Sequence, residues 1–560
     1  MKARTMKPTA LLLLPCLLLG CSKPQESAVH DVDLAVINAR IWTGDPQRPW
    51  AEALSANQGK IVAVGNNDEI ARAGTPKRTI DARGRLIVPG FIDSHLHFIE
   101  GGQQLASVQL RDARSREQLV ARIKEFVATL PPDAWLTGGG WDNSLWGGEL
   151  PTREWIDAVT GDRPAWLSRV DGHMALANSA ALRLAGVDRN TPDVPGGEIV
   201  RDANGEPTGA LKDNAMALVE RIVPPLSAEL RDRALDAAMR YANERGVTSV
   251  HSLGSWEDLD TFDRAADAGR LTVRIYGVVP LADWEQLRDR MNGDLPRSSE
   301  WLRIGGLKGY VDGSLGSRTA AMLEPFEDAP NARGLLVNAE EDLYRWISGA
   351  DKAGLHVMVH AIGDRANRIL LDIYERVAAE NGPRDRRMRI EHVQHLARED
   401  IARFGRLGVI ASMQPYHVID DGRWAERYIG ERITTSYAYR DLLDTQARLA
   451  FGSDWPVAPA TPLEGIYAAV TRRTLDDKHP DGWVPEQKVT VEEALRAYTS
   501  GAAYAAFEET IKGTLAPGFL ADFVVLGRDI FSIPAEEIRH VPVDMTVVGG
   551  TVVFERPDDL

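Results

Sequence analysis

The middle of the chain alternates short apolar runs with longer amphipathic stretches. Residues 247–253 and 355–360 have the length of buried strands, and stretches such as 340–353 carry apolar residues at helical spacing. A strand followed by a helix, repeated about eight times, predicts an α/β fold of the (β/α)8 barrel type, in which chemistry takes place where the strands end. Further apolar runs occupy residues 273–279, 304–311, 388–392, 408–414 and 448–454, and further amphipathic stretches occupy residues 227–244, 366–380 and 491–506.

Both ends of the chain have a β-rich sequence pattern that differs from the pattern of the middle. Short β runs separated by Gly, Asn and Asp turns occur before residue 88 and again after residue 509. We therefore predict one small β-sandwich assembled from residues 31–88 and 509–560, around a barrel of residues 89–508. Two stretches rich in Gly with Trp or Pro, 135–151 and 188–211, fit no repeat, and they predict an insertion of about residues 130–215 over the barrel mouth.

The N-terminus has the pattern of an export signal. Lys2, Arg4 and Lys7 precede an apolar run at residues 10–20, which is shorter than the roughly 20 apolar residues that span a bilayer. The run ends in Leu-Leu-Gly-Cys-Ser, with the cysteine at Cys21. This ending resembles the lipobox of bacterial lipoproteins, so residues 1–21 would be a lipoprotein signal peptide with its lipobox. The resemblance implies that the signal is removed before Cys21, which becomes the lipidated first residue. A plain secretory signal, cut elsewhere, is the alternative.

Composition limits the partners. The other cysteine, Cys16, lies within the signal, so the mature protein would hold no disulfide. A net charge of −16, without a cluster of Lys and Arg in the body, argues against nucleic acid as a partner. We expect a protein tethered by residues 22–30 to a bacterial membrane, facing the periplasm and anchored by lipid only. A monomer and a homodimer both remain open.

A pair of histidines ends the first barrel strand. His95 and His97 close the run at residues 91–98, and side chains two apart on a strand point to the same face. Both imidazoles can therefore reach one cation, so the pair predicts half of a metal site. Two surface histidines by chance are the alternative.

Other ligand-type residues end later strands. His360, His392 and Asp454 close predicted strands, and Lys308 lies in an otherwise apolar one. Because the strand ends of a closed barrel converge on one mouth, these distant residues can meet. Taken singly, His360 could be a buried structural histidine, Asp454 a helix cap and Lys308 a solvated side chain, and His395 competes with His392.

Lys308 needs a separate explanation, because a cation does not bind a cation. Two divalent ions about 3.5–4 Å apart call for a bridging anion. A buried lysine near positive charge has a lowered pKa, and its neutral amine can add carbon dioxide to become a carbamate. A carboxylated Lys308 would supply the bridging anion.

The order of these residues resembles the amidohydrolase superfamily, with its metal-bearing barrel and composite β-sandwich. Within it, residues 168–178, 306–318 and 389–392 resemble the YtcJ-like branch, amidohydrolase family 3, which includes N-substituted formamide deformylases. The resemblance implies zinc or another divalent metal, as one or two ions. It implies these ligands: His95, His97, His360, His392, Asp454 and, if carboxylated, Lys308.

The expected chemistry is hydrolysis by water that the metal activates. Asp454 can accept the proton of the water and pass it to the leaving group. Donors for the oxyanion are needed as well. The candidate donors are His251, Arg169, His173 and Arg318; Asp312 is a candidate substrate contact, and Trp141, Trp146 and Trp455 are candidates for an aromatic wall.

We therefore predict a metal-dependent hydrolase that cleaves a C–N bond, of amide or N-formyl type, in a small molecule. Hydrolysis of an ester, lactone or phosphoester is the alternative within the enzyme class, because activated water is indifferent to the leaving atom. A lipoprotein that binds metal or a small ligand without turnover is the alternative outside it. Asp454 argues against pure binding, which needs no proton acceptor.

Overall fold

The computed structural model describes residues 32–131, 134–293 and 299–557. The predicted signal, Cys21 and the tether lie outside the described residues. Among the described helices, none is both long enough and apolar enough to cross a membrane.

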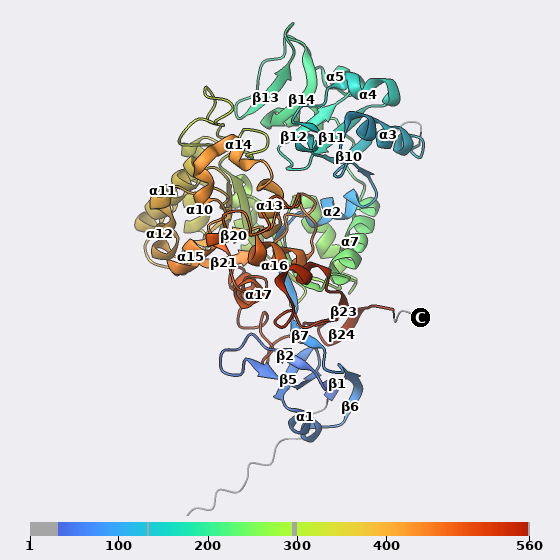
Figure 1. The fold of residues 1–560 in the computed structure, drawn as a ribbon, viewed down its shortest axis with the longest axis vertical. Coiled ribbons are helices and arrows are strands. Elements are labelled where there is room, and N and C mark those ends of the chain that lie inside the picture. Colours follow the sequence, from blue (N-terminus) through green and yellow to red (C-terminus); the bar gives the residue numbers. More distant parts are fainter. Residues whose placement is uncertain (1–31, 132–133, 294–298, 558–560) are drawn as a thin grey trace, which may run out of the picture.

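A parallel sheet of eight strands forms the centre of the molecule, as predicted (Figure 1). Each strand pairs with the next one along the chain, and a helix or a longer excursion connects them. Most strand residues are buried, as expected for a parallel sheet covered on both faces. The strands in ladder order are β8 (Phe91–Leu96), β15 (Val247–Leu253), β16 (Arg274–Pro280), β17 (Leu302–Tyr310), β18 (His356–Ala361), β19 (Arg389–His392), β20 (Ile410–Met413) and β21 (Arg448–Phe451).

The barrel closes between its last and first strands, β21 and β8. The backbone N–H of Ser453 donates to the Asp93 carboxylate over 2.9 Å, and the N–H of Asp454 donates to the carbonyl oxygen of His95 over 2.7 Å. Gly452 permits this approach, because a Cβ there would lie 2.5 Å from the backbone nitrogen of His95. The C-terminal ends of β8 and β21, which carry predicted ligands, are thus hydrogen-bonded directly to each other.

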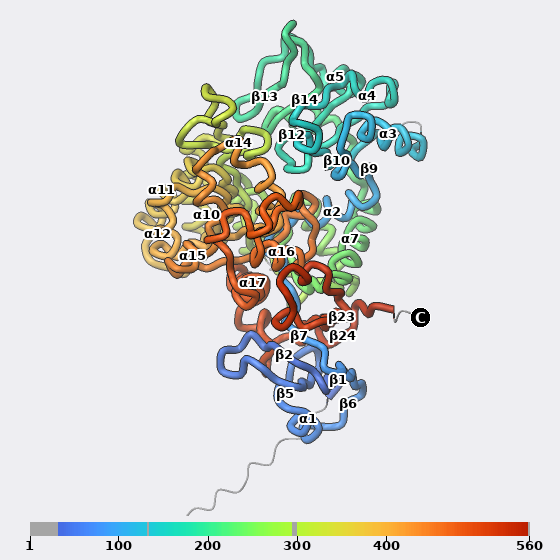
Figure 2. Tube along the Cα trace, in the orientation of Figure 1, coloured from blue at the N-terminus to red at the C-terminus, as the bar shows by residue number. Residues whose placement is uncertain are grey.

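Amphipathic helices surround the barrel (Figure 2). In α7 (Ala228–Asn243), for example, Ser227 caps the first turn by accepting a hydrogen bond from the backbone of Leu230, and one face buries Leu235 and Ala238 against the core. Other barrel helices are α8 (Trp256–Asp267), α9 (Trp284–Asn292), α10 (Glu340–Lys352), α11 (Asp364–Asn381), α12 (Arg398–Leu407), α13 (Pro415–Asp421), α15 (Tyr439–Asp444) and α16 (Pro462–Thr471).

A second domain contains two sheets from both ends of the chain, as predicted. Strand β7 (Leu86–Pro89) pairs antiparallel with β22 (Phe523–Leu526), which joins N-terminal and C-terminal segments in one sheet. The other sheet has the order β5-β4-β1-β6 and is N-terminal throughout. Their shared core includes Val36, Ile87 and Val547. The remaining bounds are β1 (Val32–Ile37), β2 (Arg40–Trp42), β3 (Trp50–Ala51), β4 (Ala53–Asn57), β5 (Lys60–Gly65), α1 (Asn67–Ala73), β6 (Pro76–Asp81), β23 (Val543–Val548) and β24 (Thr551–Glu555).

A third sheet is inserted between β8 and β15, at the opposite end of the molecule from the sandwich (Figure 1). It starts earlier than the predicted boundary near residue 130, because β9 (Val108–Gln109) pairs with β10 (Leu136–Trp141), and α3 (Arg116–Val127) lies between them in the chain. The other elements of this insertion are α4 (Arg153–Thr160), β11 (Ala165–Arg169), β12 (Met174–Ala177), α5 (Ser179–Ala185), β13 (Gly197–Arg201), β14 (Pro207–Asp213) and α6 (Ala217–Glu220).

Candidate metal centre

His95, His97 and Asp454 meet where β8 and β21 end. Oδ1 of Asp454 lies 3.3 Å from Nε2 of His95 and 3.5 Å from Nε2 of His97. One ligand atom from each of the three residues falls within 4.8 Å of the others. Burial opposes the charge of Asp454, but His95 and His97 outweigh it and hold the pKa of this carboxyl well below its usual range. Asp454 is therefore an ionised, buried carboxylate between two imidazoles.

His95 is fixed from behind by Glu391. Its Nδ1–H donates to Oε2 of Glu391 over 2.5 Å, and both side chains are fully buried. Arg389 donates to both oxygens of Glu391, over 2.7 and 3.0 Å. Burial raises the pKa of Glu391, but Arg389 and His95 more than compensate and lower it below the normal range. With Nδ1 held by Glu391, Nε2 of His95 faces Asp454, the orientation that a metal-binding histidine needs.

Lys308 reaches the same cluster from β17. Its Nζ lies 3.4 Å from Nε2 of His95 and 4.9 Å from the centre of the Tyr310 ring. Burial lowers the pKa of Lys308 to about 8. Its side chain thus faces the cluster and not the solvent.

His360 and His392 form the next side of the cluster. Their ring centres are 4.6 Å apart, and Nδ1 of His392 lies 4.0 Å from Oδ2 of Asp454. The competing residue, His395, is bonded through Nδ1 to the hydroxyl of Ser436 over 2.8 Å and borders neither cavity of the site. The structure therefore places His392, and not His395, beside Asp454.

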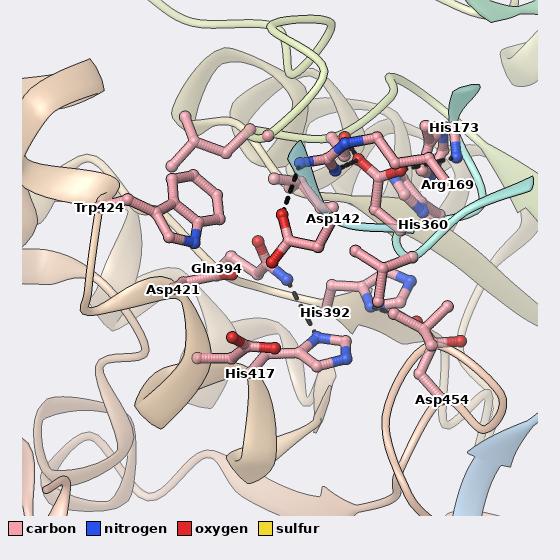
Figure 3. Close-up of a pocket in the computed structure, with 18 residues that line it drawn as sticks. Asp142, Arg169, His173, His360, His392, Gln394, His417, Asp421, Trp424 and Asp454 are labelled. Carbon is pink, nitrogen blue, oxygen red and sulfur yellow. Dashed lines mark hydrogen bonds and ion pairs between the residues drawn. The ribbon is translucent and has the colours of Figure 1, made fainter. Parts of the chain in front are cut away.

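Two cavities meet at this cluster. The inner cavity reaches Gln394, His417, Asp421 and Trp424 (Figure 3), and the outer cavity reaches His97, Lys308 and Tyr310. Both cavities are bordered by the same central residues, namely Asp171, His173, His360, His392, Asp454 and Val457.

The donor set fits a divalent cation. Imidazole nitrogens and a carboxylate oxygen are the ligands that zinc takes in catalytic sites. His95, His97 and Asp454 would hold such an ion, and His360, His392 and Lys308 border the same space. The chemistry of these donors excludes a purely oxygen-ligated site of the calcium type.

The predicted substrate contacts divide into two groups. Arg169 and His173 border the cavities, and Arg169 pairs with Asp171 over 2.6 Å. Asp312 is fully buried and accepts three backbone N–H groups, over 2.8, 3.0 and 2.8 Å, so its carboxylate holds the loop after β17.

The three tryptophans that were predicted to form an aromatic wall of the site are held by contacts elsewhere. Trp141 is buried in the inserted sheet and donates to the carbonyl oxygen of Leu167 over 2.8 Å. Trp455 stacks on Tyr241 at 4.7 Å between ring centres. Trp146 packs with Trp155 at 6.2 Å. None of these three borders either described cavity.

Arg318 and His251 also lie away from the cavities. Arg318 is paired with Asp328 over 2.6 Å. Nδ1 of His251 accepts a hydrogen bond from Arg389 over 2.9 Å, so this histidine belongs to the buried support of Glu391. Neither borders the described cavities, which removes both from the expected oxyanion donors.

Sequence reasoning missed the residues that orient the ligands. Glu391 stands in the run Arg-Ile-Glu-His, where two charges inside a buried strand signal an internal ion pair. Gln414 and His417 surround Pro415, which begins α13 directly after β20. The strand-end rule that selected His392 reaches Gln414, whereas His417 lies in the first turn of α13.

The chain belongs to the amidohydrolase family, whose model matches residues 78–554. Family membership and the His–Asp site together support metal-dependent hydrolysis of C–N bonds as the class of reaction.

Relatives of known sequence are similar over nearly the full chain. Protein LONG AFTER FAR-RED 3 of Arabidopsis thaliana is 42% identical, with 93% of this chain and 91% of the relative aligned. Putative amidohydrolase YtcJ of Bacillus subtilis is 35% identical, over 90% and 96% of the two chains. N-substituted formamide deformylase of Arthrobacter pascens is 28% identical, over 94% and 98%. The predicted resemblance to the YtcJ-like branch is confirmed.

A solved structure supports the fold. An uncharacterized metal-dependent hydrolase from Pyrococcus horikoshii superimposes with a TM-score of 0.73 at 29% identity, covering 90% of this chain and 99% of that one.

Proposed function

We propose that this protein is a zinc-dependent hydrolase of an amide or N-formyl C–N bond in a small molecule, exported and anchored by lipid at Cys21. The proposed reaction rests on one observation. The buried Asp454 carboxylate lies between His95 and His392 and borders both cavities. The similarity to N-substituted formamide deformylase supports the type of bond.

Asp454 is the proton acceptor in this proposal. A bound divalent ion would polarise the scissile carbonyl and lower the pKa of water towards 7. Asp454 stays ionised, as an acceptor must, and can take the proton from water and deliver it to the leaving nitrogen.

His173 is the donor that fits the outer side of the site. Nδ1 of His173 is bonded to Asp213 over 2.7 Å, which directs Nε2 away from that carboxylate. Its ring centre lies 4.9 Å from that of His360, and it borders both cavities. His173 can therefore bind a polar group of the substrate close to the ion.

Lys308 is carboxylated to a carbamate in this proposal. Its Nζ is close enough to His95 to place two added oxygens in the cluster. An intact-mass measurement under native conditions would show one added carbon dioxide per chain, which a Lys308→Met variant lacks. A wild-type mass without the addition favours a free amine and a site with one ion.

A substrate panel tests the function. Wild-type protein loaded with zinc is offered N-formyl and N-acyl amines, together with matched esters, lactones and phosphoesters, and release of product is followed. We expect turnover of the amides, abolished by chelator and by Asp454→Asn. Turnover of the esters or phosphoesters alone contradicts the C–N assignment, and bound zinc without any turnover favours a binding lipoprotein.

A further inference from the structure

Two neighbouring imidazoles of the site are held by glutamines in opposite ways. Nδ1–H of His392 donates to Oε1 of Gln414 over 2.8 Å. Nδ1 of His417 instead accepts from Nε2 of Gln394 over 3.3 Å. The two rings are nearly parallel, with centres 6.4 Å apart. Figure 3 shows Gln394 and His417 joined beside His392.

These hydrogen bonds give the two rings different chemistry. A neutral imidazole carries one N–H and one lone pair. His392 has its proton on Nδ1, so its Nε2 lone pair can bind a metal ion. Because Nδ1 of His417 accepts from Gln394, the proton of the neutral ring sits on Nε2, which then donates a hydrogen bond. His392, His417 and Asp454 are close enough to hold an ion together, but only if the proton of His417 moves to Nδ1 and the bond from Gln394 is lost.

Nε2 of His417 is buried and has no partner among the described residues. The side chain is 7% exposed, and the ring borders only the inner cavity. A buried donor without an acceptor is unfavourable, so the arrangement becomes favourable once an acceptor enters the cavity. The acceptor must come from the cavity that His417 shares with Asp454 and His392.

We propose that Nε2–H of His417 is the hydrogen-bond donor to the carbonyl oxygen of the substrate, and that Gln394 is the residue that positions it. This inference rests on the proposed function and adds a residue to it. When the oxygen of water bonds to the carbonyl carbon, the π electron pair moves to the carbonyl oxygen, and His417 stabilises that charge without losing its proton. The pair returns as the C–N bond breaks, and the nitrogen leaves with the electrons of that bond and with the proton that Asp454 took from the water.

The assignment also orients the substrate. His417 borders only the inner cavity, whereas Lys308 borders only the outer one. The carbonyl oxygen therefore points into the inner cavity, and the leaving amine lies towards the outer cavity. A short acyl group, such as formyl, suits this orientation because it does not cover the side chains that border both cavities.

Binding of product carboxylates tests the donor without requiring turnover. Sodium formate and sodium acetate are titrated calorimetrically into zinc-loaded wild type, His417→Phe and His417→Gln. The phenylalanine keeps the ring shape and removes the donor, and the glutamine restores an N–H. We expect the Phe variant to bind formate at least about tenfold more weakly, since one hydrogen bond is lost, and the Gln variant to recover most of the loss.

The matched control is His395→Phe. His395 is also buried, and its Nε2 likewise has no partner within the described part of the chain, but it borders neither cavity. We expect this variant to bind formate like the wild type. Equal affinity in wild type and His417→Phe, or no carboxylate binding by the wild type, overturns the proposal. Zinc content that falls in His417→Phe alone also overturns it, because His417 would then be a metal ligand.

Kinetics separate this inference from the proposed function. If the wild type cleaves formamides, His417→Phe lowers kcat about 10²–10³-fold, as loss of one oxyanion donor does, with KM nearly unchanged. A wild type that binds formate through His417 but cleaves no amide refutes the proposed function and leaves the donor assignment intact.

Discussion

Asp454 and His95 are joined twice, although they stand at opposite ends of the barrel sequence. The backbone N–H of Asp454 donates to the carbonyl oxygen of His95 over 2.7 Å, and Oδ1 of Asp454 lies 3.3 Å from Nε2 of His95. The bond that closes the barrel therefore also fixes the distance between a candidate metal ligand and the proposed proton acceptor. The same contact therefore closes the barrel and brings the residues of the site together.

Glu391→Gln should weaken metal binding while the fold persists. The amide keeps the shape of Glu391 but cannot hold the Nδ1 proton of His95 as strongly, and loss of such a partner lowers metal affinity about 10–100-fold. Chelator competition measures the affinity. Glu380→Gln, on an exposed pair with Arg376, is the control and should leave the affinity unchanged. Unchanged affinity in Glu391→Gln would contradict the orienting role.

Asp312→Ala should destabilise the protein strongly. The carboxylate accepts backbone N–H groups of Ala321, Ile362 and Gly363, and each buried donor left unpaired costs about 1–3 kcal/mol. Urea unfolding should show a loss of about 3 kcal/mol or more, with Asp312→Asn losing less because one oxygen remains. A stable Asp312→Ala variant with altered substrate affinity would restore Asp312 as a substrate contact.

Asp522→Ala should uncouple the β-sandwich from the barrel. Asp522 accepts from Nε and Nη2 of Arg274 over 2.6 and 2.9 Å, and both side chains are buried. Removing one member of a buried pair costs about 3–5 kcal/mol. Thermal unfolding should shift by several degrees, whereas Glu380→Ala on the surface should shift little. Equal shifts in the two variants would show that the buried pair is dispensable.

Cys21→Ala should release the protein from the membrane. Covalent acyl chains contribute about 0.8 kcal/mol per buried methylene, so their loss removes the expected anchor. Labelling with a palmitate analogue, followed by fractionation, compares the variant with the wild type. Label retained in Cys21→Ala, or a wild type without label, contradicts the lipobox assignment.

The candidate ligands could be predicted because their positions relative to the barrel strands determine where they lie. His95 and His392 lie at the ends of buried strands, and His97 and Asp454 follow β8 and β21 within three residues. Closure of a parallel barrel brings such strand ends together whatever the loops do. The composite sandwich could be predicted from the short β runs at both ends of the chain. These inferences needed only local pattern and one rule of topology.

The substrate contacts could not be predicted because partners distant in sequence decide where they point. Trp455 turns to Tyr241 in α7, and Arg318 turns to Asp328 from a left-handed backbone position at φ 55°. His251 lies within β15 and not at its end, so its ring meets Arg389 below the rim. The charged pair in β19 was visible in the sequence, but its direction inside the barrel was not.

Chelation followed by metal return measures whether the buried cluster performs the reaction. Release of amine from an N-formyl amine is recorded for wild type as purified, after removal of metal, after addition of zinc, and for zinc-loaded Asp454→Asn. We expect turnover to vanish with the metal, return with zinc, and fall about 10²-fold or more in Asp454→Asn at equal zinc content. Turnover that survives metal removal, or an Asp454→Asn variant as active as the wild type, would contradict the assignment.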